Sequence, residues 1–218
     1  MAPQPCGMVH PLPGTPQVGT EGTSLVASHP TKSSGEAPVE MSRCERAFDA
    51  FSNKTDYITF ESYTGQGKRL AEVRGDDPGS PAVARLTAEL EKMWAQFGPM
   101  ADTNQDGRVD RGEWVPYMEG MSAMLASLDP DVEWPLEPYI RLLFDVIDAD
   151  SDGRITQTEY ADWLESHGLA SDTDIEGAFA SLDLDGNGTL SLQEFSQCGR
   201  NYWTTSDPAL PGARWMGP

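Results

Sequence analysis

The sequence predicts a mostly helical protein built from repeated helix–loop–helix units. Apolar residues recur at helical spacing from Met41 onward. Three acidic loops of one pattern, which begin at Asp102, Asp148 and Asp183, separate the predicted helices. No alternating stretch longer than a few residues indicates a strand. We therefore expect an all-α, compact fold of four units in two pairs, with short β-pairing between neighbouring loops and a C-terminal tail that covers the core.

The N-terminal region differs in composition from the rest of the chain. Residues 1–40 are rich in Pro, Gly, Ser and Thr and lack apolar periodicity, so they cannot bury enough apolar area to offset their ordering entropy. We expect a disordered tail over 1–40, a first pair of units over 41–128, a second pair over 129–200 and a capping tail over 201–218.

Helix caps and apolar periodicity predict the individual helices in order. Ser80 and Pro81 form an N-cap and first-turn pair, and the helix that they begin is expected to stop before Pro99. The other predicted helices cover residues 42–51, 59–73, 112–126, 136–147, 158–167, 172–182 and 192–200.

The three acidic loops place oxygen donors at fixed positions. Carboxylate or amide side chains occupy positions 1, 3 and 5, and short alternate spacing lets a curled loop turn them inward. These residues are Asp102, Asn104, Asp106, Asp148, Asp150, Asp152, Asp183, Asp185 and Asn187. Hard oxygen ligands of this kind are preferred by Ca²⁺ and Mg²⁺ over softer ligands.

The second half of each loop completes the predicted site. Position 6 is glycine, where the chain must turn sharply, and position 8 is apolar, suited to pairing between loops. Position 7 offers a backbone carbonyl, and positions 9 and 12 offer side chains. These residues are Arg108, Asp110, Glu113, Arg154, Thr156, Glu159, Thr189, Ser191 and Glu194. The glutamate at position 12 favours the larger coordination shell of Ca²⁺.

A simpler interpretation is that these stretches are acidic turns followed by ordinary capping boxes, since positions 9 and 12 also have capping-box spacing. Three occurrences of a pattern that fixes several positions argue against it. The loops carry four, four and three carboxylates, which would repel one another without cations. We expect three Ca²⁺ ions, with Mg²⁺ as a competitor.

These loops resemble the EF-hand family from about Met41 to the end of the chain. Phe144 and Phe179 stand four residues before their loops, and aromatic residues follow the final glutamates, as the resemblance implies. Gly98 departs from this pattern before the first acidic loop, so the entering helix there is expected to be bent or shortened.

EF-hand loops pair, which implies a fourth hand upstream. Phe48 to Tyr63 has the helix–loop–helix outline, but if Ile58 takes position 8, then position 1 is Phe51 and position 12 is Ser62. We expect a degenerate hand that binds no metal and pairs with the loop at Asp102.

The four-hand layout resembles the sarcoplasmic calcium-binding, calerythrin and photoprotein-like group. The C-terminal tail resembles that of photoproteins and luciferin-binding proteins, in which it caps an apolar cavity. Photoproteins also have a histidine about four residues before the tail tryptophan, but here Gly199 precedes Trp203 at that distance. The resemblance leaves open a Ca²⁺-triggered carrier or oxygenase of an apolar ligand.

Other features have simpler interpretations. Met118, Met121 and Met124 could form the soft groove of a Ca²⁺ sensor, but such a stripe is more often core. If the C-terminal tail covers that groove, the core interpretation is favoured further by the apolar residues of the tail, which are Trp203, Leu210 and Trp215. His167 ends a predicted helix, where a cation is favoured, and is assigned no catalytic role. No nucleophilic triad or phosphate-cradling loop is evident, so we expect no enzymatic activity.

Composition restricts the partners. With 15 basic and 35 acidic residues the formal net charge is −20, which disfavours nucleic acid and anionic membrane surfaces. Three scattered cysteines and no long apolar run indicate a cytoplasmic protein that does not span a membrane. We expect a monomeric Ca²⁺ buffer or signal modulator, with a protein target or an apolar small molecule as further candidate partners.

Overall fold

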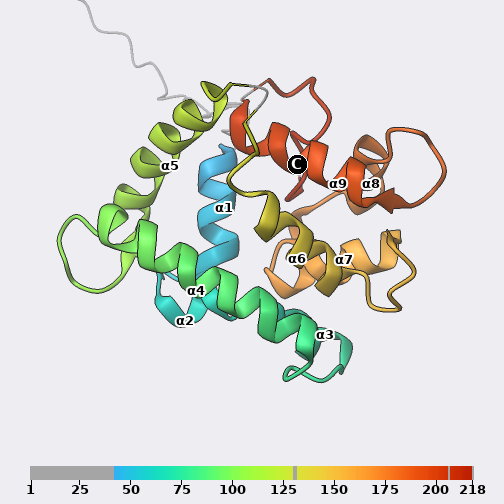
Figure 1. Ribbon diagram of the computed structural model, residues 1–218, viewed down its shortest axis with the longest axis horizontal. Helices are drawn as coiled ribbons and strands as arrows, with labels where there is room; N and C mark the ends of the chain where they lie inside the picture. The colour runs from blue at the N-terminus through green and yellow to red at the C-terminus, as the bar shows by residue number, and fades with distance from the viewer. Residues whose placement is uncertain (1–41, 130–131, 206, 218) are drawn as a thin grey trace, which may run out of the picture. The chain divides into compact units, whose positions relative to one another are not determined.

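The computed structural model describes residues 42–129, 132–205 and 207–217, and the tail predicted over 1–40 lies outside them. The helices are α1 (Arg43–Ser52), α2 (Phe60–Thr64), α3 (Gln66–Arg74), α4 (Pro81–Ala101), α5 (Arg111–Ala126), α6 (Glu137–Ile147), α7 (Gln157–Ser166), α8 (Ile175–Leu182) and α9 (Leu192–Thr204), with a 3₁₀ turn, η1 (Ala170–Asp172). The strands are β1 (Tyr57–Ile58), β2 (Val109–Asp110), β3 (Arg154–Ile155) and β4 (Leu190–Ser191). The mostly helical prediction is confirmed (Figure 1).

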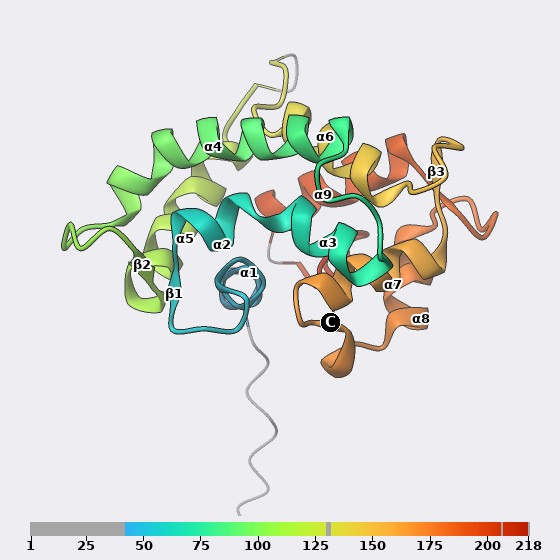
Figure 2. The same ribbon diagram turned by 90° about the horizontal axis from the view of Figure 1, so that it is seen from below.

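Four helix–loop–helix units pair through their loops. Strand β1 pairs antiparallel with β2, and β3 with β4, so that Ile58 lies opposite Val109 and Ile155 opposite Leu190 (Figure 2). All four of these position-8 side chains are buried. The predicted loop pairing is therefore confirmed, including the register that puts Ile58 at position 8 of the upstream unit.

Short polar residues start the helices that leave the loops. Thr59, Asp110, Thr156 and Ser191 each form a capping box with the residue three positions later. The Ser80 hydroxyl accepts a hydrogen bond from Val83 N, and Pro81 begins α4. Local capping chemistry thus sets where the chain leaves each loop.

Several predicted helix limits are wrong. The single helix predicted over 59–73 is two, because Gly65 separates α2 from α3 and lets the chain pass where a Cβ would lie 2.7 Å from Glu61 O. Helix α4 continues through Pro99 to Ala101: proline fits helical φ, and in this last turn the helix tolerates the lost hydrogen bond and the crowding of the ring against the carbonyl four residues earlier. The entering helix is therefore not shortened. Helix α8 begins at Ile175 rather than at 172, and α9 runs to Thr204 rather than to 200.

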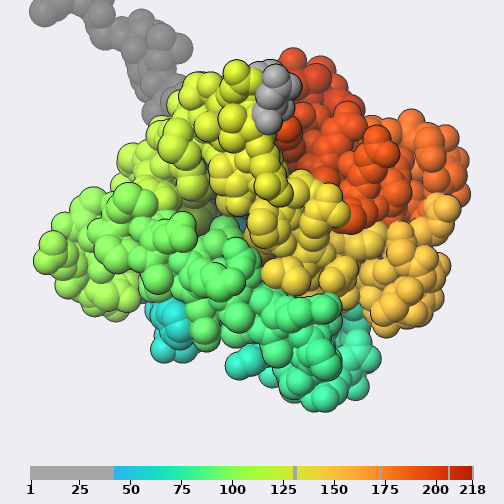
Figure 3. Space-filling view, viewed as in Figure 1, coloured from blue at the N-terminus to red at the C-terminus, as the bar shows by residue number. Residues whose placement is uncertain are grey.

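Apolar side chains from all nine helices of the described residues form one continuous core. Helix α1 lies deeper than α4, α5 and α6 in the direction of view of Figure 1 and is almost wholly hidden in the space-filling view (Figure 3). The first pair of units contacts the second where α4 packs on α6 and α3 packs on α7. These two contacts place the end of α3 beside the loop that begins at Asp148.

The C-terminal tail folds back onto the core, as predicted. Trp215 is fully buried, with its ring 5.2 Å from that of Trp163 and 5.1 Å from that of Phe195. Leu210, expected to extend this contact, is instead 42% exposed, because it lies in the turn through which the tail reverses. The tail therefore covers the core mainly through its last residues.

Two other expectations need correction. Met118 is buried and Met121 is partly buried against the core, but Met124 is 54% exposed, so the methionine stripe of α5 belongs to the core except at its last member. His167 is not the favourable cation expected at the end of its helix: it is 1% exposed, and its Nδ1 lies 2.9 Å from Trp163 O. Burial and the nearby charge of Arg69 lower the His167 pKa from 6.5 to about 3, so the ring is neutral. Among the described residues, none of the helices combines the length and apolarity needed to cross a membrane.

Candidate metal centres

The first residue of each acidic loop organises the loop backbone. Asp148 Oδ1 accepts a hydrogen bond from Asp152 N at 3.1 Å, and its Oδ2 accepts one from Gly153 N at 2.9 Å. Asp102 and Asp183 make the same two bonds in their own loops. The position-6 glycines have φ of 82–85°, a left-handed geometry that glycine adopts without steric cost. The sequence prediction that glycine is needed there is thereby explained.

The side chains at positions 3 and 5 fold the same way in all three loops. Asp150 Oδ1 accepts from Asp152 N, and Asp152 Oδ1 accepts from Arg154 N. The other two loops repeat these bonds. Position 4 is also left-handed, at 59° for Gln105 and Ser151, which sequence reasoning had missed. The three loops therefore share one backbone geometry, and in the two loops of the second pair it brings carboxylate donors close together.

Carboxylate oxygens gather within 4.8 Å of one another in the two loops of the second pair. In one loop the group is Asp148, Asp150 and Asp152, and in the other it is Asp183, Asp185 and Glu194. The first acidic loop has an amide, Asn104, at position 3 in place of a carboxylate. Oxygen donors alone, crowded at this spacing, form a set that fits a hard divalent cation.

The glutamate at position 12 connects the two ends of each loop. Glu159 Oε2 accepts from Thr156 N at 2.8 Å, and Oε1 accepts from Ala149 N at 2.8 Å, ten residues upstream. Glu113 and Glu194 repeat both contacts. The capping box and the loop closure therefore use the same side chain. Of the three glutamates, Glu194 also lies within 4.8 Å of two other loop carboxylates, as a carboxylate that closes an oxygen cage would. Glu113 and Glu159 are tied to both ends of their loops but are not part of such a group among the described residues.

The protonation preferences of these acids reflect burial and crowding. Burial raises the Asp148 pKa, the nearby charges of Glu159 and Asp152 raise it further, and hydrogen bonds from two backbone N–H groups offset part of the rise. Burial also opposes ionisation of Glu159, but backbone N–H groups of Thr156 and Ala149 together lower its pKa. A divalent cation would relieve the repulsion that these carboxylates exert on one another.

The two arginines at position 7 behave differently. Arg108 Nε lies 3.2 Å from Asp106 Oδ2, and its guanidinium carbon lies 4.0 Å from the centre of the Tyr57 ring. Arg154 instead donates to Thr189 Oγ1 of the paired loop at 3.0 Å. Among the described residues, an arginine forms an ion pair within 4.0 Å with a candidate ligand carboxylate only in the first acidic loop.

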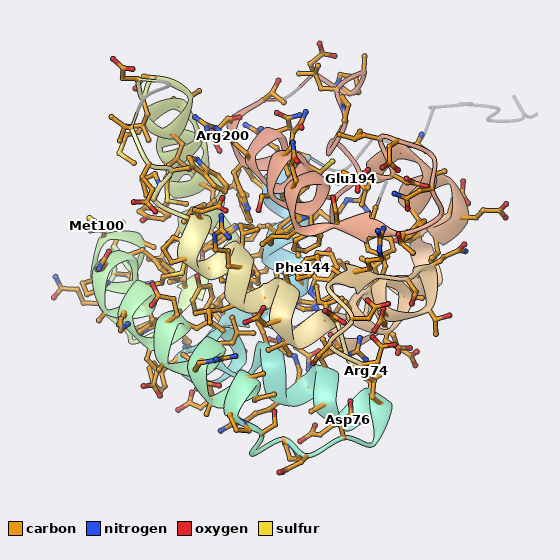
Figure 4. The ribbon with its side chains drawn as sticks, turned by 45° about the vertical axis from the view of Figure 1, so that its right-hand side comes forward. Arg74, Asp76, Met100, Phe144, Glu194 and Arg200 are labelled. Carbon is orange, nitrogen blue, oxygen red and sulfur yellow. The ribbon has the colours of Figure 1, made fainter. Side chains whose placement is uncertain are left out.

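A residue that sequence reasoning did not single out braces the loop at Asp148. Arg74, in the last turn of α3, donates to Val146 O at 3.0 Å and Ile147 O at 2.6 Å, at the end of the entering helix α6. It also pairs with Asp162 on the exiting helix α7 at 3.2 Å, and its side chain is 8% exposed (Figure 4). The guanidinium of Arg74, from the first pair of units, thus contacts both helices that flank the loop at Asp148 in the second pair.

The upstream loop lacks the features of the other three. Its position 1 is Phe51, which is buried and packs edge-on against Tyr63 and Trp114. At position 12 the Ser62 hydroxyl accepts from Thr59 N, where the other loops have a glutamate. The loop keeps the capping geometry and the β pairing but presents aromatic core where the others present a carboxylate.

Comparisons with known proteins agree with this geometry. An EF-hand domain pair profile matches residues 137–198, and an EF hand profile matches residues 100–115. Calerythrin from Saccharopolyspora erythraea is 25% identical over 165 residues, which cover 75% of this chain and 92% of calerythrin. The structure of calcium-loaded apo-aequorin from Aequorea victoria shares the fold at a TM-score of 0.60 and 20% identity, covering 77% of this chain and 91% of that one.

The probable calcium-binding protein CML16 from Oryza sativa subsp. japonica is more similar in sequence. It is 31% identical over 155 residues, which cover 70% of this chain and 75% of that protein. The repeated loops, their pairing and this similarity lead to one assignment: the chain belongs to the EF-hand family of calcium-binding proteins.

Proposed function

We propose that the protein is a non-catalytic cytoplasmic Ca²⁺ buffer or signal modulator that binds three Ca²⁺ ions, with Mg²⁺ as a competitor. The ligands are residues at positions 1, 3, 5, 7, 9 and 12 of the loops that begin at Asp102, Asp148 and Asp183, and position 7 contributes its backbone carbonyl. The observation that carries this proposal is the position-12 glutamate, which spans the entry and exit of every acidic loop. The upstream loop is proposed to pair without binding metal.

A closed core supports a buffer rather than an exposed-groove sensor. Trp203 and Trp215 are 4% and 0% exposed, and the ring of Trp203 stacks on Phe51 at 6.3 Å. A sensor must uncover an apolar surface when Ca²⁺ binds, and here that would displace the C-terminal tail. We propose that Ca²⁺ binding leaves this packing in place and that the protein acts as a monomer.

A Ca²⁺-triggered carrier or oxygenase of an apolar ligand is the alternative, and packing at Gly199 argues against it. A Cβ at this position would lie 3.0 Å from Ile140 Cδ1 and 3.2 Å from the Trp215 ring. The photoprotein-like histidine therefore has no room at residue 199. The core at this point is occupied by the protein's own side chains.

The cysteines support the proposed compartment. Cys44 and Cys198 are free thiols with side chains buried in the core, and burial raises the pKa of both. Unpaired buried thiols are typical of proteins kept in a reducing environment.

Ca²⁺ titration followed by tryptophan emission and by a hydrophobic dye tests the proposal. A buffer should bind three equivalents of Ca²⁺ with little gain in dye fluorescence. A large dye signal on saturation would instead indicate a sensor. Stoichiometric uptake of a coelenterazine-like compound would favour the carrier. Asp145→Asn, which removes an exposed carboxylate outside the loops, serves as the control and should still bind three equivalents.

A further inference from the structure

A second candidate site lies away from the acidic loops. A cavity of about 600 Å³ opens between the start of α1, the middle of α5, the end of α9 and the C-terminal tail. Its lining includes Arg43 and Arg46 from α1, Ser122 from α5 and Arg214 from the tail. None of its lining residues belongs to a predicted metal ligand set, so it is independent of the Ca²⁺ sites.

The charge of this cavity is opposite to that of the protein. Three of its five charged lining residues are arginines, the others being Glu119 and Asp207, although the chain has 35 acidic residues against 15 basic. Neither Arg46 nor Arg214 has a carboxylate within 4.0 Å among the described residues. In so acidic a protein, two guanidinium groups facing one cavity without a carboxylate partner favour an external anion.

A buried hydroxyl provides a second, independent observation. Ser122 is 3% exposed, and its Oγ has no hydrogen-bond partner within the part of the chain that the structure describes. Leaving a buried hydroxyl unpaired costs free energy, and a serine in a helix can usually bond to its own backbone. Ser122 lines the cavity although its Oγ is buried, so rotation of this side chain would let a polar group bound there supply the missing partner.

The rest of the lining is apolar in part. Ala123, Tyr202, Pro208 and Ala213 line the same space as the arginines. A bare inorganic ion would leave this surface unused, whereas a molecule with an anionic head and a short apolar body would contact both. We propose that this cavity binds an organic carboxylate of that kind, with its head group at Arg46 and Arg214 and within reach of Ser122.

Calorimetry with the full-length, Ca²⁺-saturated protein tests the proposal, with 4-phenylbutyrate as the probe and its primary amide, 4-phenylbutyramide, as the uncharged comparison. The carboxylate should bind with a Kd below about 1 mM and at least about tenfold more tightly than the amide. Arg46→Gln and Arg214→Gln should each weaken carboxylate binding by about tenfold or more. The number of Ca²⁺ ions bound should not change in either variant.

Two further variants separate recognition from folding. Arg200→Gln changes a half-buried arginine of α9 (Figure 4). Arg200 does not line the cavity, so this change should leave binding unchanged. Ser122→Ala should weaken carboxylate binding while leaving the ligand-free protein at least as stable, because it removes an unpaired buried hydroxyl. The proposal is overturned if the carboxylate does not bind by about 1 mM, if the amide binds equally well, or if Arg200→Gln loses as much affinity as Arg46→Gln.

Discussion

Replacing Arg74 with methionine should weaken the contact between the two EF-hand pairs and destabilise the protein. The substitution keeps the apolar stem but removes a guanidinium that binds Val146 O, Ile147 O and Asp162 from a position only 8% exposed. Breaking a buried ion pair costs about 3–5 kcal/mol. Because Asp162 is 30% exposed and regains water, we expect a loss of about 3 kcal/mol in the free energy of unfolding.

Urea unfolding at saturating Ca²⁺, followed by tryptophan emission, measures this loss. Arg85→Met is the matched control, since Arg85 also joins the two pairs, through Asp145, but both side chains are more than half exposed. That change should cost about 0.5 kcal/mol or less. The Arg74 variant should also bind Ca²⁺ more weakly at the loop that begins at Asp148, reported by the Gly153 amide resonance. Equal stability losses in the two variants, with an unchanged Gly153 titration, would refute the bracing role.

Three further predictions concern other parts of the molecule. Arg108→Gln should tighten Ca²⁺ binding at the first acidic loop by about two- to fivefold in calorimetry, because it removes the guanidinium that competes with Ca²⁺ for Asp106. An unchanged affinity would exclude competition between Arg108 and Ca²⁺. The His167 pKa is lowered to about 3, so its contribution to stability should be complete above pH 6.5 and lost as pH falls, by about 2 kcal/mol at pH 5. His167→Asn should reduce the loss of stability between about pH 6.5 and pH 5. A pH profile identical to that of the unmodified protein would contradict the lowered His167 pKa. Gly199→Ala should cost about 1–3 kcal/mol in thermal unfolding and shift Trp215 emission, since the new methyl group meets the indole; a neutral change would mean that the tail can move aside.

The sequence predicted what short-range chemistry determines. Each acidic loop is a local pattern in which the position-1 carboxylate, the position-6 glycine and the position-12 glutamate act within a dozen residues. The pairing register followed from the apolar position 8, even at Ile58, where the ligands are missing. Loop geometry and the starts of the helices that leave the loops could therefore be inferred from residue types alone.

The remaining features depend on residues far apart in the chain. Arg74 meets groups 72 to 88 residues later, so only the packing of α3 on α7 reveals its role. The arginine-lined cavity likewise combines α1, α5, α9 and the tail. The break between α2 and α3 was missed because it depends on one close backbone approach at Gly65. The end of α4 was placed too early because its last turn tolerates Pro99.

The number of Ca²⁺ ions bound tests the central claim most directly. Calorimetric titration of the Ca²⁺-free protein should give three equivalents, and Glu113→Gln, Glu159→Gln and Glu194→Gln should each give two, because each removes one carboxylate that closes a loop. A wild-type protein that binds no Ca²⁺, or three variants that all retain three ions, would contradict the account.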